Sequence, residues 1–125
     1  MKTLTLTFFL ALTCSFGFAQ QSKIDSLSNT LHTATHDSIR LSSIGGITSY
    51  YQASDSDSML FYTSKGLSIA RKNKQSLHEG NFLTYQAFAL RQKGEYAATL
   101  KSFLQAFEIL QNTASEKNAY GLGKE

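Results

Sequence analysis

Apolar residues recur along this chain with the period of an α-helix, and no stretch sustains the alternation of a half-buried strand. Proline, which breaks helix interiors, is absent. Short polar stretches separate the periodic segments, notably residues 33–36 and 54–58. Such side chains compete with a helix for backbone hydrogen bonds and favour turns and caps. The sequence therefore predicts an all-α fold.

The turns also predict where individual helices begin and end. Asp37 carries a side-chain oxygen that can accept from the free amides of a helix start, so we expect it to be an N-cap. Gly94 follows the fourth helix and suits the left-handed backbone that ends many helices. We expect a fifth helix over residues 96–111, a break at 112–114, and a sixth helix from Ser115.

The N-terminal segment has the features of a secretory signal peptide. An apolar run over residues 4–13 follows a short basic start and is too short to span a bilayer comfortably. Gly17 and Ala19 are small residues at the two positions that a signal peptidase inspects. We therefore predict a signal peptide over residues 1–19, and a periplasmic or extracellular protein. A retained N-terminal anchor and lipid attachment at Cys14 are the alternatives.

Removal of this segment limits the chemistry of the mature chain. Cys14 is the single cysteine and would leave with it, which excludes disulfides, thiol catalysis and cysteine-ligated zinc. The net charge of the whole chain is only +3, and the basic residues are spread along it. A nucleic-acid-binding protein usually shows a concentrated basic patch. We therefore expect no nucleic-acid partner.

No group of residues predicts catalysis, so the chain is not expected to be an enzyme. Paired carboxylates, a serine triad and a phosphate-binding glycine loop are all missing from the sequence. His32 and His36 have the spacing of two helical metal ligands, but a turn is expected between them and no third ligand is obvious. Asp55 and Asp57 match two positions of a calcium loop that lacks its glycine and closing glutamate, so capping explains them better. We therefore expect neither a metal nor a cofactor.

A recurring pattern covers the segment between Leu83 and Ala106. It reads Leu83-x2-Gln86-Ala87-x2-Leu90, then Gly94-Glu95-Tyr96, then Thr99-x3-Phe103-x2-Ala106. This pattern resembles the tetratricopeptide repeat, a helix–turn–helix unit of about 34 residues. The sequence departs from the family pattern at Gln86, where the family has Leu, and at Thr99, where it has Ala.

Two further copies of the pattern are expected on either side. The earlier one matches at Ile44, Ile47 and Tyr51, and the later one is a fragment that matches at Ala119 and Leu122. The resemblance implies a right-handed solenoid of antiparallel helix hairpins. The expected organisation is a signal peptide (1–19), an N-terminal helix and linker (20–37), and tetratricopeptide-like repeats (38–125), at about 38–73 and 78–112 with a partial copy at 115–125.

The resemblance also implies a function, which is non-catalytic binding of a protein or peptide. The first helix of each repeat would line a concave groove. The implied groove residues are Asn81, Thr84, Phe88, Arg91 and Gln92 from the second copy, Ser42, Gly45, Ser49 and Gln52 from the first, and Lys117, Tyr120 and Lys124 from the fragment. Aromatic rings beside Arg91 and Lys124 predict an extended or helical peptide of some acidic character. Phe88 could instead be buried against the next helix.

The arrangement also resembles the exported, repeat-rich sensor regions that precede a membrane span in some bacterial histidine kinases and regulators. The expected function is therefore an interaction module of the bacterial cell envelope. The alternative is a truncated sensor ectodomain of a two-component signalling protein whose output domain is missing. We expect no membrane span in the mature chain. An incomplete last repeat would leave its helix open, so self-association through that helix is a further expectation.

Overall fold

Helices account for all the regular secondary structure in the described part of the chain. The structure is a computed structural model that describes the backbone of residues 1–122 and the side chains of residues 1–3 and 19–114. The helices are α1 (Lys2–Thr33), α2 (Asp37–Tyr51), α3 (Ser56–Lys72), α4 (Ser76–Gln92) and α5 (Tyr96–Leu122). The predicted all-α class is confirmed. No helix among the described residues is both long enough and apolar enough to cross a membrane.

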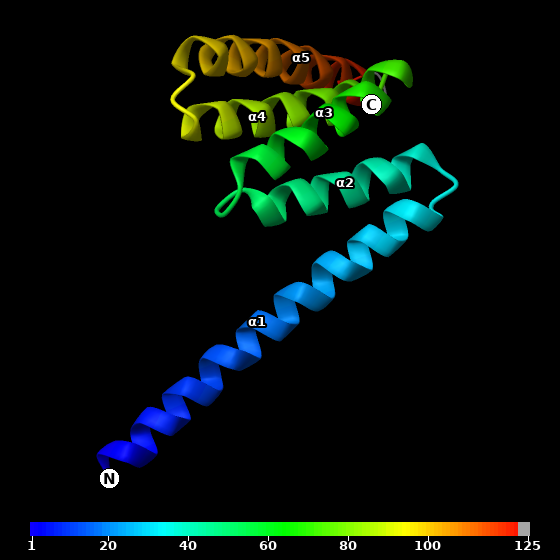
Figure 1. Ribbon diagram of the computed structural model, residues 1–125. Helices are drawn as coiled ribbons and strands as arrows, with labels where there is room; N and C mark the ends of the chain where they lie inside the picture. Colours follow the sequence, from blue (N-terminus) through cyan, green and yellow to red (C-terminus); the bar gives the residue numbers. More distant parts are fainter. Residues whose placement is uncertain (123–125) are drawn as a thin grey trace.

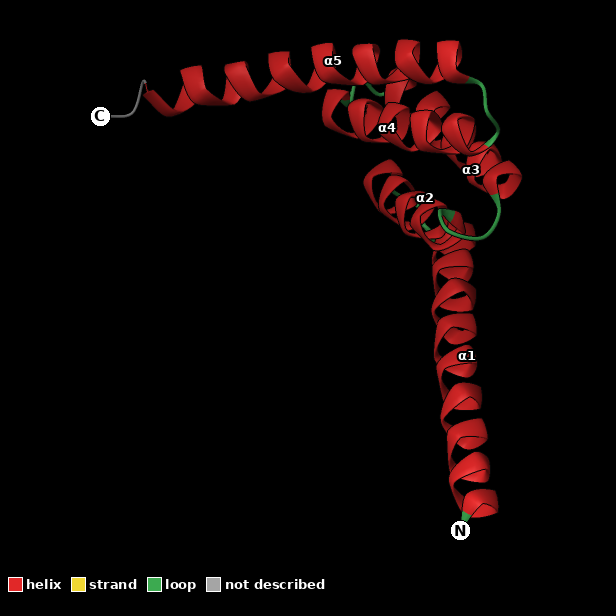
Figure 2. Ribbon diagram, turned by 90° about the vertical axis from the view of Figure 1, so that its left-hand side faces the viewer, coloured by secondary structure: helices red, strands yellow, loops and turns green. Residues whose placement is uncertain are grey.

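Each helix packs against the next one in the chain. Helices α2 to α5 reverse direction at every turn, whereas α1 projects away from them as one long rod (Figure 1). In addition, α2 contacts α4, although α3 separates them in the sequence. Figure 2 shows α5 extending past the end of α4. The order of packing therefore follows the order of the sequence, with α2 and α4 brought side by side.

The core lies between successive helices and is centred on α4. Phe82 is 2% exposed and is the largest of the fully buried side chains. Around it pack aliphatic residues from α2, α3 and α5, together with partly buried aromatic rings. The members of this cluster are Leu41, Ile44, Leu67, Ala70, Phe82, Leu83 and Ala106.

Glycines mark the points where neighbouring helices come closest. A Cβ atom added at Gly66 of α3 would lie 2.4 Å from Cζ of Phe82 in α4. A Cβ atom added at Gly80 of α4 would lie 2.5 Å from Cγ of Leu110 in α5. Because glycine has no side chain, each of these large side chains can lie directly across the backbone of the next helix.

The turns after α3 and α4 have the same geometry although their sequences differ. Gly94 has φ 78°, which confirms the predicted left-handed conformation, and Lys74 has φ 53° at the equivalent place. A left-handed residue of this kind lets the following amide reach back to a carbonyl of the helix. These bonds are Gln75 N–H to the Ala70 oxygen at 2.9 Å and Glu95 N–H to the Leu90 oxygen at 3.0 Å.

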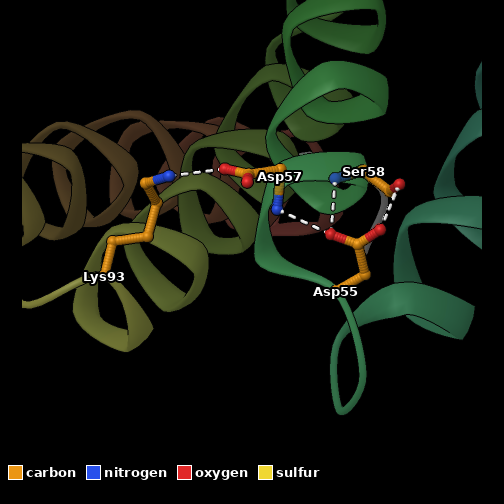
Figure 3. A network of polar contacts seen from close by, with 4 residues as sticks. All are labelled: Asp55, Asp57, Ser58 and Lys93. Carbon is orange, nitrogen blue, oxygen red and sulfur yellow. Dashed lines mark hydrogen bonds and ion pairs between the residues drawn. The ribbon is translucent and has the colours of Figure 1, made fainter.

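The polar stretch before α3 forms a helix cap and an ion pair (Figure 3). The Asp55 carboxylate accepts from Ser58 Oγ at 2.6 Å and from the backbone amides of Asp57 and Ser58 at 3.0 and 3.1 Å. These hydrogen bonds lower the pKa of Asp55, and the bond from the Ser58 hydroxyl contributes most. The Asp57 carboxylate accepts from Lys93 Nζ at the end of α4, and this bond raises the pKa of Lys93. The expectation that capping explains this acidic pair is confirmed for Asp55.

Two predicted boundaries are wrong. Asp37 is the first residue of α2 rather than its N-cap, which is His36. The Asp37 carboxylate is engaged elsewhere, with Arg40 at 3.6 Å and Asn73 at 2.7 Å. The expected break at residues 112–114 is also missing, because α5 continues through it to Leu122. The predicted sixth helix is therefore the distal part of α5.

The N-terminal helix is also longer than expected. The predicted short helix containing Ile24, Leu27 and Leu31 is the C-terminal part of α1, which begins at Lys2 and is continuous. The turn expected at residues 33–36 is present between α1 and α2. The predicted signal peptide and the first packing segment thus share one helix, and cleavage after Ala19 stays a prediction.

Candidate functional site

A groove of about 480 Å³ lies between α2 and α4. Residues of α4 spaced three or four apart supply one wall, because that spacing places them on one helix face. Residues of α2 supply the other wall. The lining residues are Leu41, Ser42, Gly45 and Gln52 from α2, and His78, Asn81, Phe82, Thr84, Tyr85 and Phe88 from α4.

The groove combines an apolar base with polar sides. Leu41 and Phe82 are almost fully buried, so their side chains belong to the base. A Cβ atom added at Gly45 would meet nothing within 4 Å, so the α2 wall is open at this point. Thr84 donates its hydroxyl proton to the Gly80 carbonyl at 3.0 Å, which leaves its oxygen free to act as an acceptor.

Two side-chain hydrogen bonds hold the groove at its ends. Near the C-terminal ends of α2 and α4, Gln92 Nε2 donates to the Gln52 carbonyl at 2.6 Å. Near the start of α2, Asn73 Nδ2 in the turn before α4 donates to the Asp37 carboxylate at 2.7 Å. Both bonds join segments far apart in the sequence. They therefore link α2 to α4 and to the turn that precedes α4.

Phe88 has both of the roles considered for it. Its ring packs edge-on against Phe103 of α5, with 5.5 Å between the ring centroids. The same residue lines the groove, where it is only half-buried. The Arg91 guanidinium carbon lies 5.6 Å from the centroid of the Phe88 ring, a cation–π arrangement. A cationic group thus stands beside the groove at the Phe88 end.

The structure brings together most of the predicted groove residues whose side chains it describes. Asn81, Thr84 and Phe88 line the groove with Ser42, Gly45 and Gln52. Arg91 and Gln92 adjoin it without lining it, through Phe88 and Gln52 respectively. Ser49 lines a different hollow between α1 and α2. Lys124 lies outside the described residues, as do the side chains of Lys117 and Tyr120.

Four lining residues were not among the predicted ones: Leu41, His78, Phe82 and Tyr85. His78 and Tyr85 lie three or four positions from Asn81, so helical periodicity alone would have found them. Leu41 and Phe82 are apolar residues that helical periodicity assigns to the core. They are buried there, and each also lines the base of the groove.

The groove offers hydrogen bonds and apolar surface rather than charge. No Asp, Glu, Lys or Arg is among its described lining residues. Two carboxamides, Gln52 and Asn81, each provide donors and acceptors. The Gln52 carboxamide is free for a ligand because its backbone carbonyl, not its side chain, accepts from Gln92. Within the described residues, no three His, Cys, Asp or Glu side chains are grouped to hold a metal ion. This arrangement suits an uncharged, partly apolar chain.

Comparison with known proteins adds no further assignment: no family model, curated protein or solved structure matches this chain.

Proposed function

We propose that this chain is a non-catalytic, tetratricopeptide-like interaction module that binds an extended peptide segment between α2 and α4. The observation that carries the proposal is the groove itself. It is formed by the first helix of each helix pair, and its lining includes six positions that the repeat resemblance assigns to a concave surface. The predicted signal peptide would place this module in the bacterial cell envelope.

The pattern of helix contacts is compatible with stacked helix hairpins, and the right-handed turn of the proposed solenoid is what the repeat resemblance implies. Helix α2 contacts α4, whereas α3 does not contact α5 among the described residues. The second helix pair therefore packs on the first through α4, which contacts both α2 and α3, while α5 and α3 lie apart. A stack of hairpins packed in this way has a concave inner face made by its first helices, and such faces are typical binding surfaces of solenoid proteins.

The lining residues indicate what kind of peptide would bind. The carboxamides of Asn81 and Gln52 can each pair with an amide of an extended backbone. An apolar side chain of the ligand would contact Phe82 at the base of the groove. Because Arg91 stands beside the Phe88 end, an acidic group is favoured there and not along the rest of the groove. The acidic character expected from the sequence is thus confined, in this proposal, to one end of the ligand.

Blocking the groove at Gly45 tests the proposal. Gly45→Phe would place a ring in the open part of the α2 wall, where no atom lies within 4 Å of a new Cβ. A displayed library of random peptides, selected on the wild-type chain, supplies the probe. We expect the selected peptide to bind Gly45→Phe at least about tenfold more weakly in fluorescence polarisation, since its contacts would be sterically excluded.

Gly45→Ala is the matched control, because a methyl group leaves most of the groove open, and it should retain binding. Circular dichroism of both variants checks that the helices are intact. If the library yields no peptide, or if Gly45→Phe binds the selected peptide as tightly as wild type, the groove is not the binding site.

A further inference from the structure

An apolar stripe follows the outer side of α5. Tyr96, Leu100, Leu104 and Phe107 are 72%, 60%, 59% and 64% exposed. They are spaced three or four residues apart and therefore share one helix face. Among the described residues α5 contacts only α4, so nothing in the structure covers this stripe. Isolated exposed apolar residues are common, but four on one helix face form a contiguous surface.

Two opposite charges lie along one edge of the stripe. Lys101 and Glu108 are seven residues apart, which places them on the same side of the helix. Both are exposed, and neither forms an ion pair with another described residue. The other edge of the stripe carries Phe103, which is half-buried against Phe88. On the charged edge, Glu108 also lines a hollow between α3, α4 and α5, together with Arg71 and Glu79.

We propose that two copies of this chain associate through antiparallel pairing of their α5 helices, about a two-fold axis beside Leu104. In that register Leu104 meets Leu104 of the second copy. Leu100 meets Phe107 of the second copy, and this contact occurs twice by symmetry. The same register sets Lys101 opposite Glu108 of the second copy, also twice. One axis therefore pairs three of the four stripe residues, Leu100, Leu104 and Phe107, together with the charged edge, in an isologous interface.

The position of the charges selects this arrangement over a parallel one. In antiparallel helix pairs the same edge of each helix meets, so Lys101 and Glu108 can pair reciprocally. In a parallel pair, that edge meets the opposite edge of the other helix, where Phe103 lies, and both charges would lack partners. A foreign apolar helix could cover the stripe, but nothing would then account for charges placed symmetrically about Leu104. The second copy is therefore the occupant that the residues favour.

Sedimentation velocity of the full-length chain over a range of concentrations tests the pairing. The wild-type chain should show a concentration-dependent dimer, and Leu104→Glu should remain monomeric because it brings two carboxylates together at the axis. Leu77→Glu is the matched control: Leu77 is an exposed apolar residue of α4, 45% exposed and outside the stripe, and this variant should dimerise like wild type. Circular dichroism checks that Leu104→Glu keeps its helices.

A charge exchange tests the register and does not depend on the fold of Leu104→Glu. Lys101→Glu and Glu108→Lys should each weaken self-association about tenfold, since each replaces two attractive pairs by two repulsive ones. An equimolar mixture of the two variants should recover the wild-type affinity, because every Glu then faces a Lys. The double variant, which exchanges both residues in one chain, should recover it as well.

Three results would overturn the proposal. The first is a wild-type chain that stays monomeric at every concentration. The second is a dimer that persists unchanged in Leu104→Glu, which would show association through another surface. The third is a mixture of the two charge variants that associates no better than either variant alone. None of these results bears on the groove between α2 and α4, because no stripe residue lines it.

Discussion

Helix α4 meets two of its three neighbours, α3 and α2, in opposite ways. Toward α3, the Phe82 ring lies over Gly66 with no room for a single methyl group. Toward α2, Gly45 leaves an open wall, and the space between the helices is a groove. A glycine thus allows close contact on one side of α4 and leaves room on the other. The residue type alone does not show which of these two roles a glycine has.

The two sides of α4 meet at Phe82. This side chain is buried against α3 and also forms part of the groove base. Packing of the core and shaping of the groove therefore depend on one ring, whereas most of the other groove residues contribute little to the core. Substitutions on the two sides of α4 should differ both in size and in sign.

The largest expected effect is on the packed side. Phe82→Ala removes the largest of the fully buried side chains and leaves a cavity against Gly66, so we expect a loss of about 3–5 kcal/mol in the free energy of unfolding. Urea denaturation followed by circular dichroism measures it. A loss below about 1 kcal/mol would show that the ring is not held between α3 and α4.

Gly66→Ala should come next. Alanine favours a helix over glycine by about 1 kcal/mol, but its methyl group would collide with the Phe82 ring. Overpacking of this kind typically costs about 1–3 kcal/mol. We therefore expect Gly66→Ala to lower the free energy of unfolding in urea denaturation. The loss in the double variant Gly66→Ala/Phe82→Leu should be smaller than the sum of the losses in Gly66→Ala and in Phe82→Leu. If the two losses in free energy were strictly additive, the methyl group added at position 66 would not be in contact with the side chain at position 82.

On the groove side the sign should reverse. Gly45→Ala adds helix propensity in open space, so we expect an increase of up to about 1 kcal/mol in the free energy of unfolding. The adjacent Gly46 is the matched comparison, because a Cβ atom there would lie 2.9 Å from Cδ1 of Leu27. Gly46→Ala should therefore gain less than Gly45→Ala. An equal rise in the melting temperature of both variants would show that Leu27 of α1 does not pack against α2 at Gly46.

A smaller effect is expected at the hydrogen bond that crosses the groove end. Gln92→Ala removes the exposed bond to the Gln52 carbonyl. We expect a loss of about 0.5 kcal/mol, at the low end for such bonds because water can replace the donor. Gln111, an exposed glutamine on α5, provides a control substitution to alanine. An effect above about 2 kcal/mol in urea denaturation would mean that α2 and α4 depend on this bridge.

Acid should weaken the cap at the start of α3. Hydrogen bonding lowers the pKa of Asp55 in the folded state, so its contribution to stability is present above the unfolded-state pKa and is lost as the pH falls through the folded-state pKa. Asn also caps helices but does not titrate. Asp55→Asn should therefore flatten this part of the pH profile of thermal unfolding. An unchanged profile would assign the acid sensitivity to other carboxylates.

The fold class and one helix end followed from local sequence. The absence of proline, the helical periodicity and Gly94 each act within one turn of chain, and their structural consequences are confirmed. Lys74 carried no such signal, because lysine, unlike glycine, has no preference for the left-handed conformation that it adopts in this turn. The error at residues 112–114 has a similar cause. Thr113 donates its hydroxyl proton to the Ile109 carbonyl at 2.8 Å, so a residue that often marks a turn is accommodated within the helix.

The groove could be predicted as a set of positions but not as a shape. The repeat pattern assigned Asn81, Thr84 and Phe88 to one helix face, and all three line the groove. The pattern could not show that Phe88 is shared with Phe103, since that depends on where α5 lies. Nor could it show that Arg91 packs over a ring instead of lining the groove. These features depend on distances between helices, which local sequence does not determine.

The way α1 is anchored has a consequence for maturation of the chain. Its contacts with the remainder of the fold involve Ile24, Leu27 and Leu31, which are buried or partly buried, while its first half projects away from the other helices (Figure 1). A protease that cut after Ala19 would therefore remove only the projecting half. The new N-terminus would lie one helical turn before the first anchoring residue, so processing would leave the folded body unchanged.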